Sequence, residues 1–140
     1  MPDIAPLAAE LRFVLNRLHR RLRSQQVGDD LTISQLSVLS MLRQHGSLTA
    51  GDLATKEHVR PPSMTRIISA LDAANMVERK DNPADGRQVL VSLSPGGAAR
   101  ADAESAAREK WLSQQLAVLE PAQRQVLREA LVILNHLSDG

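Results

Sequence analysis

Residues 47–95 read SLTAGDLATKEHVRPPSMTRIISALDAANMVERKDNPADGRQVLVSLSP, and this stretch decides the fold. Thr49, with an acidic residue three positions later, has the spacing of a capping box and predicts a short helix over 50–56. Two consecutive prolines suit the first turn of a helix, where the amide hydrogens have no partner in any case. They predict a second helix over 60–74.

The second half of the stretch predicts a hairpin. Residues 77–80 and 88–93 are expected to form two strands, and the polar loop 81–87 between them carries the turn signals Asn-Pro and Asp-Gly. We expect Gly86 to give this loop its conformational freedom. A helix-turn-helix followed by a hairpin is a winged helix-turn-helix, here over residues 32–94, and this fold usually reads duplex DNA.

Apolar residues recur every three or four positions on both sides of this lobe, over 4–27 and again over 95–138. We therefore predict a mainly α protein with a small β-hairpin wing, built as one domain over 1–140. Its order is four helices, a hairpin and two helices. The flanking helices need partners for their apolar faces, so we expect them to be dimerisation helices that pack against a second copy.

Several short motifs resemble those of the MarR family of bacterial transcription regulators, and the resemblance covers nearly the whole chain. They are Leu53-Ala54, Ser63-Met64-Thr65-Arg66, Leu71, Met76-Val77-Glu78-Arg79, Asp85-Gly86-Arg87 and Leu93-Ser94-Pro95-Gly96-Gly97. The wing pattern is the most specific part. The resemblance implies a homodimer held through both chain ends, with two DNA-reading lobes facing one side.

Candidate DNA contacts are eight polar residues of the lobe: Arg60, Ser63, Thr65, Arg66, Arg79, Lys80, Asp85 and Arg87. The first residues of a recognition helix face base edges, where Arg reads guanine and Ser or Thr bonds a base or a phosphate. The free amides of the helix start also attract phosphate. The ordinary alternative is a helix start with solvated arginines.

The wing has its own set of expected contacts. Arg79 and Lys80 are expected to contact phosphates, and the alternative is a solvated ion pair with Glu78 or Asp81. Arg87 is expected to enter the minor groove. Asp85 is expected to brace its guanidinium, a pairing that the resemblance also implies.

Composition narrows the classes of function. The chain has 17 Lys and Arg against 16 Asp and Glu, a net charge of +1, which is low for a nucleic-acid binder. The basic residues of the lobe nevertheless concentrate at 56–66 and 79–87. The absence of cysteine excludes disulfides, thiolate metal sites and sensing through cysteine oxidation. Phe13 and Trp111 are the only aromatic residues, which disfavours binding of single strands by stacking.

Other classes find no support in the sequence. The four histidines lack the spacing of metal ligands, so we expect no metal and no cofactor. No nucleophile with a base and no phosphate-binding glycine loop is present, so we expect no enzyme. No signal peptide and no membrane-spanning run is found, which predicts a soluble cytoplasmic protein that does not bind a membrane.

The first hypothesis is a homodimeric regulator, expected to be a repressor, that binds double-stranded DNA at an inverted-repeat operator. The family often binds small aromatic acids between the dimer helices and the lobe. Phe13, Arg17 and Trp111 are the candidate lining residues for such an aromatic or anionic effector. The alternative is that the five arginines around Arg20 form a solvated face. A regulator without an effector stays open. So does a dimeric protein-interaction module or antirepressor that does not contact DNA.

Overall fold

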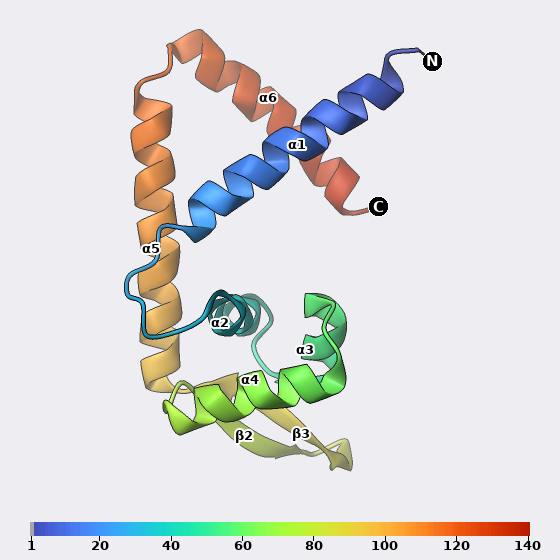
Figure 1. Ribbon diagram of the computed structural model, residues 1–140, viewed down its shortest axis with the longest axis vertical. Helices are drawn as coiled ribbons and strands as arrows, with labels where there is room; N and C mark the ends of the chain where they lie inside the picture. Colours follow the sequence, from blue (N-terminus) through green and yellow to red (C-terminus); the bar gives the residue numbers. More distant parts are fainter. Residues whose placement is uncertain (1) are drawn as a thin grey trace.

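The computed structural model describes residues 2–140, which form six helices and a three-stranded antiparallel sheet (Figure 1). The predicted order of four helices, a hairpin and two helices is confirmed. The elements in chain order are α1 (Ile4–Arg23), α2 (Ile33–His45), β1 (Leu48–Thr49), α3 (Ala50–Glu57), α4 (Pro61–Ala73), β2 (Val77–Asn82), β3 (Asp85–Leu93), α5 (Pro95–Ala117) and α6 (Pro121–Ser138).

The local signals in the sequence place the helix ends. Thr32 caps α2: its Oγ1 accepts from the amide of Gln35 at 3.1 Å, and the Gln35 side chain accepts from the Thr32 amide at 2.9 Å. Thr49 caps α3 by accepting from the third amide of the helix at 3.0 Å. Asn75, at φ 60°, follows α4 in the left-handed conformation, which Asn adopts more readily than most residues.

The wing differs from its prediction. Strand β2 extends to Asn82 and β3 begins at Asp85, so only two residues form the turn between them. Gly86 lies within β3 and has no positive φ, so its expected role in the turn is wrong. Strand β1 is a further difference: two residues are too short to show a period, yet Leu48 pairs with Val91 and closes a sheet of order β1-β3-β2.

The core lies between the helices of the lobe, its sheet and the start of α5. Leu39, Leu42, Leu53, Met64 and Leu71 are fully buried there. Strand β3 packs into the core over only part of its length. Val91 is buried, but Val89, nearer the wing tip, is 42% exposed.

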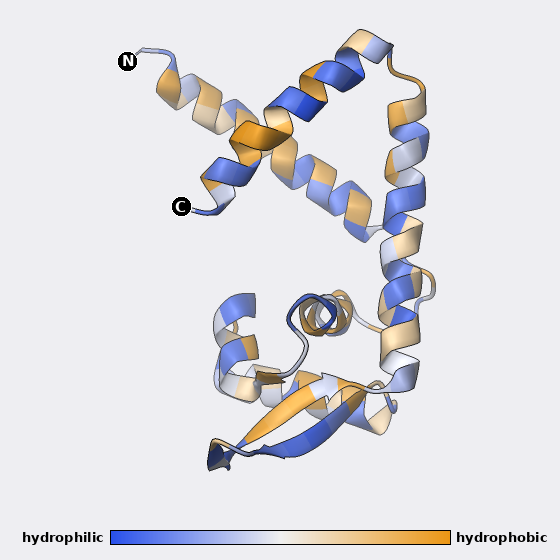
Figure 2. Ribbon diagram, turned by 180° about the vertical axis from the view of Figure 1, so that it is seen from behind, coloured by the Kyte–Doolittle hydropathy of each residue, from blue (hydrophilic) through white to orange (hydrophobic). Residues whose placement is uncertain are grey.

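Helix α5 links the lobe to the other half of the molecule, from which α1 and α6 extend to one side (Figure 1). Neither α1 nor α6 contains a buried residue, although both carry bands of apolar residues (Figure 2). Large apolar side chains therefore stay exposed on both, including Leu7 at 60%, Leu131 at 56% and Ile133 at 63%. Among the residues described, no helix is long and apolar enough to cross a bilayer.

Candidate nucleic-acid interface

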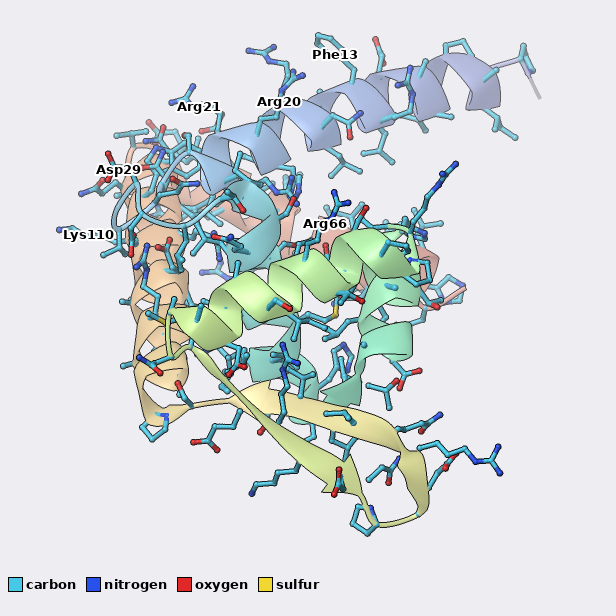
Figure 3. The ribbon with its side chains drawn as sticks, turned by 60° about the horizontal axis from the view of Figure 1, so that its bottom comes forward. Phe13, Arg20, Arg21, Asp29, Arg66 and Lys110 are labelled. Atoms are coloured by element: carbon cyan, nitrogen blue, oxygen red, sulfur yellow. The ribbon has the colours of Figure 1, made fainter. Side chains whose placement is uncertain are left out.

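Helix α4, which the sequence predicts to be the recognition helix, has an exposed start. Arg60 is its N-cap, with extended backbone and no side-chain cap, and Pro61 occupies the first helical position. Because both prolines lack an amide hydrogen, Ser63 carries the first amide of the helix, and fewer amides than expected are available to a phosphate. Arg60, Ser63 and Arg66 are all exposed, and Arg66 projects from the surface of α4 (Figure 3).

Thr65 has a partly structural role. Its hydroxyl donates to the carbonyl of Pro61 at 3.0 Å, one turn earlier in the same helix. The side chain also lines a small hollow between α4 and the wing, together with Arg79 and Val89. The hydroxyl proton is thus already used, and only the oxygen lone pairs and the methyl group are free for DNA.

The side chain of Arg79 contacts α4. Its Nε lies 3.5 Å from Oδ2 of Asp72, and its Nη2 donates to the hydroxyl of Ser69 at 3.4 Å. The alternative partners Glu78 and Asp81 are not within ion-pair distance. These long, exposed contacts join the base of the wing to the second half of α4 and are individually weak.

The two other basic residues of the wing are exposed. Lys80 and Arg87 take part in none of the ion pairs within residues 2–140. Asp85 does not brace the Arg87 guanidinium, which corrects the expectation from the sequence. Instead, Oδ1 of Asp85 accepts from the backbone amide of Arg87 at 3.0 Å. The carboxylate therefore fixes the backbone beside the turn and leaves the guanidinium extended into solvent.

The predicted effector residues are only partly brought together. Arg17 and Trp111 line one hollow between α1 and α5, of about 290 Å³, together with Arg21. The Arg21 guanidinium lies 5.2 Å from the centre of the Trp111 ring and so covers one face of it. Phe13 does not line this hollow; it is 58% exposed, and Arg17 lies 5.7 Å from its ring centre. Figure 3 shows Phe13 and Arg21 along α1.

A second hollow, here called the α1–α2–α5 hollow, was not predicted. It has a volume of about 180 Å³ and lies where the end of α1 meets α2 and α5. Its lining residues are His19, Leu22, Arg23, Gln26, Ile33, Leu36, Ser37, Ser40 and Arg108. Two arginines, a histidine and two serines line this space, and the hydroxyl of Ser37 already donates to the carboxylate of Glu57, at 2.8 and 3.0 Å from its two oxygens. The spacing of His19 and Arg23 places them on one face of α1, but nothing in the sequence joins them to Arg108.

Comparison with known proteins assigns the chain to a protein family. Residues 31–89 match the model of the MarR family. The chain is 44% identical over 135 residues to an uncharacterized HTH-type transcriptional regulator, Mb0904, of Mycobacterium bovis, covering 96% of this chain and 94% of that one. It is 34% identical over 97 residues to the multiple antibiotic resistance protein MarR of Salmonella typhimurium, covering 69% of this chain and 67% of that one. The chain belongs to the MarR family.

Solved structures of MarR-type regulators agree with this assignment. A putative transcriptional regulator from Pseudomonas aeruginosa superimposes with a TM-score of 0.88 at 29% identity, covering all of this chain and 98% of that one. The MarR-family fold expected from the sequence is thus confirmed over the whole length. Members of the family are DNA-binding transcriptional regulators and not enzymes, which agrees with the expectation of no enzyme.

Proposed function

We propose that this MarR-family regulator is a homodimeric repressor that binds an inverted-repeat operator in the cytoplasm. The observation that carries the proposal is the exposed array of Arg60, Arg66 and Arg87 on the recognition helix and the wing. Arg87 is unpaired within the described chain, so no ion pair has to be broken before it contacts DNA. Repression is also supported by a relative 26% identical over 123 residues, the HTH-type transcriptional repressor MdtR of Bacillus subtilis.

The homodimer is supported by the apolar faces of α1 and α6. Two helices of 20 and 18 residues without a buried residue leave an apolar surface that water covers in the single chain. Burial against a second copy stabilises the dimer by about 25 cal/mol for each Å² of apolar surface removed from water. We therefore propose 4–27 and 95–138 as the dimerisation helices and 32–94 as the DNA-reading lobe.

An anionic effector is proposed for the α1–α2–α5 hollow rather than for the expected site at Phe13, Arg17 and Trp111. Arg23 and Arg108 give this hollow positive charge, and Ser40 supplies a hydroxyl, whereas the hydroxyl of Ser37 already donates to Glu57. The regulation of DNA binding by 6-hydroxynicotinic acid is described for BpsR of Bordetella bronchiseptica, whose structure matches at 26% identity with a TM-score of 0.63. An aromatic acid of similar size is the class of ligand to test first.

The test is a titration of the purified protein into duplex DNA from its own upstream intergenic region and into a scrambled duplex, at two salt concentrations. Tight, salt-sensitive binding that prefers the upstream duplex is expected, because phosphate neutralisation releases counterions. If the upstream duplex is not preferred, a selection from genomic fragments identifies the operator. A protein that binds every duplex weakly and without salt dependence would instead be a protein-interaction module.

A further inference from the structure

A buried carboxylate lies where α5 meets the segment 24–32, which joins α1 to the lobe. Glu104 of α5 is 3% exposed. Its Oε1 accepts from the backbone amide of Val27 at 3.2 Å and from Nε of Arg100 at 3.0 Å. Its Oε2 is buried without a hydrogen-bond partner in the structure. Taking a carboxylate out of water costs free energy that one ion pair need not repay, and here one of its oxygens has no partner, so this position is held against a free-energy penalty.

Arg100 connects this carboxylate to the same segment a second time. Its side chain is 14% exposed, and its Nη1 and Nη2 donate to the two oxygens of Asp30 at 3.1 and 2.9 Å. The ion pair lowers the pKa of Asp30 and raises that of Arg100. A planar guanidinium bonded on both sides permits only one relative placement of its partners. We call Asp30, Arg100 and Glu104, with the Val27 amide, the Arg100 clamp.

The clamp lies between the two halves of the molecule. Along the chain, the lobe connects to α1 through the segment 24–32 and to α6 through α5, and the clamp ties that segment to α5. It acts near the start of a 23-residue helix, about 35 Å long at the usual rise per residue. A change in the angle between α5 and the lobe at this point would therefore displace the recognition helix relative to α1 and α6.

We infer that the Arg100 clamp is a positioning device that sets which separation of half-sites the dimer accepts. The inference rests on the proposed function. Each added base pair moves a half-site by about 3.4 Å and rotates it by about 35°, so two rigidly held lobes discriminate strongly between spacings. Lobes released from their dimer helices accept several spacings, although each recognition helix still reads its own half-site.

The experiment measures affinity for the operator and for the same duplex with one base pair inserted between the half-sites. Asp30→Ala opens the exposed side of the clamp. The double variant Arg100→Met with Glu104→Leu removes the buried pair without leaving a buried charge unpaired, because the remaining carboxylate of Asp30 is 61% exposed. Asp102→Ala is the matched control, because it breaks the exposed ion pair between Arg43 of α2 and α5, at 2.8 Å, and leaves the clamp intact.

We expect wild type and the control to prefer the native spacing at least tenfold, and both clamp variants to reduce that ratio at least threefold while remaining folded and dimeric. A loss of affinity that is equal for both duplexes is what a merely structural role predicts, and it would overturn the inference. If the double variant does not fold, Asp30→Ala alone decides. Wild type that binds its operator without a spacing preference would also overturn the clamp and leave the proposed function standing, whereas wild type that binds no duplex specifically overturns both.

Discussion

The carboxylate of Asp85 bonds the backbone amide of Arg87 at 3.0 Å and not its guanidinium. Asp85, which the sequence presents as the partner of a charge, is thus the first residue of β3 and holds the backbone beside the turn. This arrangement leaves the Arg87 guanidinium free, and it separates two effects that a salt bridge would have combined. Removing the guanidinium should affect DNA binding alone, whereas removing the carboxylate should affect the shape of the wing.

Arg87→Ala is expected to weaken operator binding by about 1–3 kcal/mol, because a minor-groove contact and its charge are lost. Its thermal midpoint should not change, since the side chain makes no ion pair within the described chain. Fluorescence anisotropy with the operator measures the affinity, and Arg87→Lys should recover part of it. Unchanged affinity in a folded dimer would remove Arg87 from the interface.

Lys80→Ala is expected to weaken binding to operator and scrambled duplex alike, because a phosphate contact carries no sequence information. The slope of log affinity against log salt should become shallower by about 0.9, the value for one neutralised phosphate. Titrations at several salt concentrations measure that slope. A loss confined to the operator would mean that Lys80 reads a base.

Leu131→Glu is expected to shift the protein from dimer to monomer, because it places a charge on an apolar face proposed to be covered by a second copy. Sedimentation measures the shift. Gln125→Glu adds the same charge six residues earlier on α6, about 120° around the helix, and should leave the dimer intact. A dimer that persists in both variants would place the interface elsewhere.

Gly97→Ala is expected to destabilise the fold by about 3 kcal/mol, at the upper end of the cost of overpacking. A Cβ at Gly97 would overlap the backbone carbonyl of Met76, which has no room to shift because it accepts from the amide of Ser94 at 3.0 Å. Gly96→Ala is the matched control, since its Cβ would meet only ordinary contacts and α-helices favour Ala. Urea denaturation of both variants provides the comparison, and equal stabilities would contradict the close approach.

The Asp30–Arg100 pair should make stability depend on acid. The pKa of Asp30 is lowered below its ordinary 3.8 in the folded state, so its contribution is present above that value and is lost as pH falls through the lower, folded pKa. Wild type should therefore exceed Asp30→Asn in thermal midpoint at neutral pH, and the difference should shrink well below pH 3.8. A difference that does not vary with pH would show that the charge of Asp30 is not responsible.

The sequence predicts most of the fold because its signals are local. Thr32 and Thr49 cap the helices that they precede, and Asn75 adopts the left-handed backbone. The two-residue strand β1 could not be predicted, because its only cause is pairing with a strand more than 40 residues away. The spacing of apolar residues also does not predict which residues of helices far apart in the sequence line the same hollow.

The same limit explains the differences at the candidate sites. Asp72 pairs with Arg79 because α4 packs beside the wing, and Arg108 joins Arg23 because α5 passes the end of α1. Neither relation is visible in the spacing of residues along the chain. Residue type and helix position did predict the exposed start of α4, since both are local properties.

The order β1-β3-β2 has a consequence for solubility. It leaves β2 as the long open edge of the sheet, with backbone groups that another strand could pair with. That edge carries Glu78, Arg79, Lys80 and Asp81 in succession, all exposed. Charges of both signs along an edge strand oppose the docking of further strands, so the same short segment that presents cations to a phosphate also protects the wing from edge-to-edge aggregation.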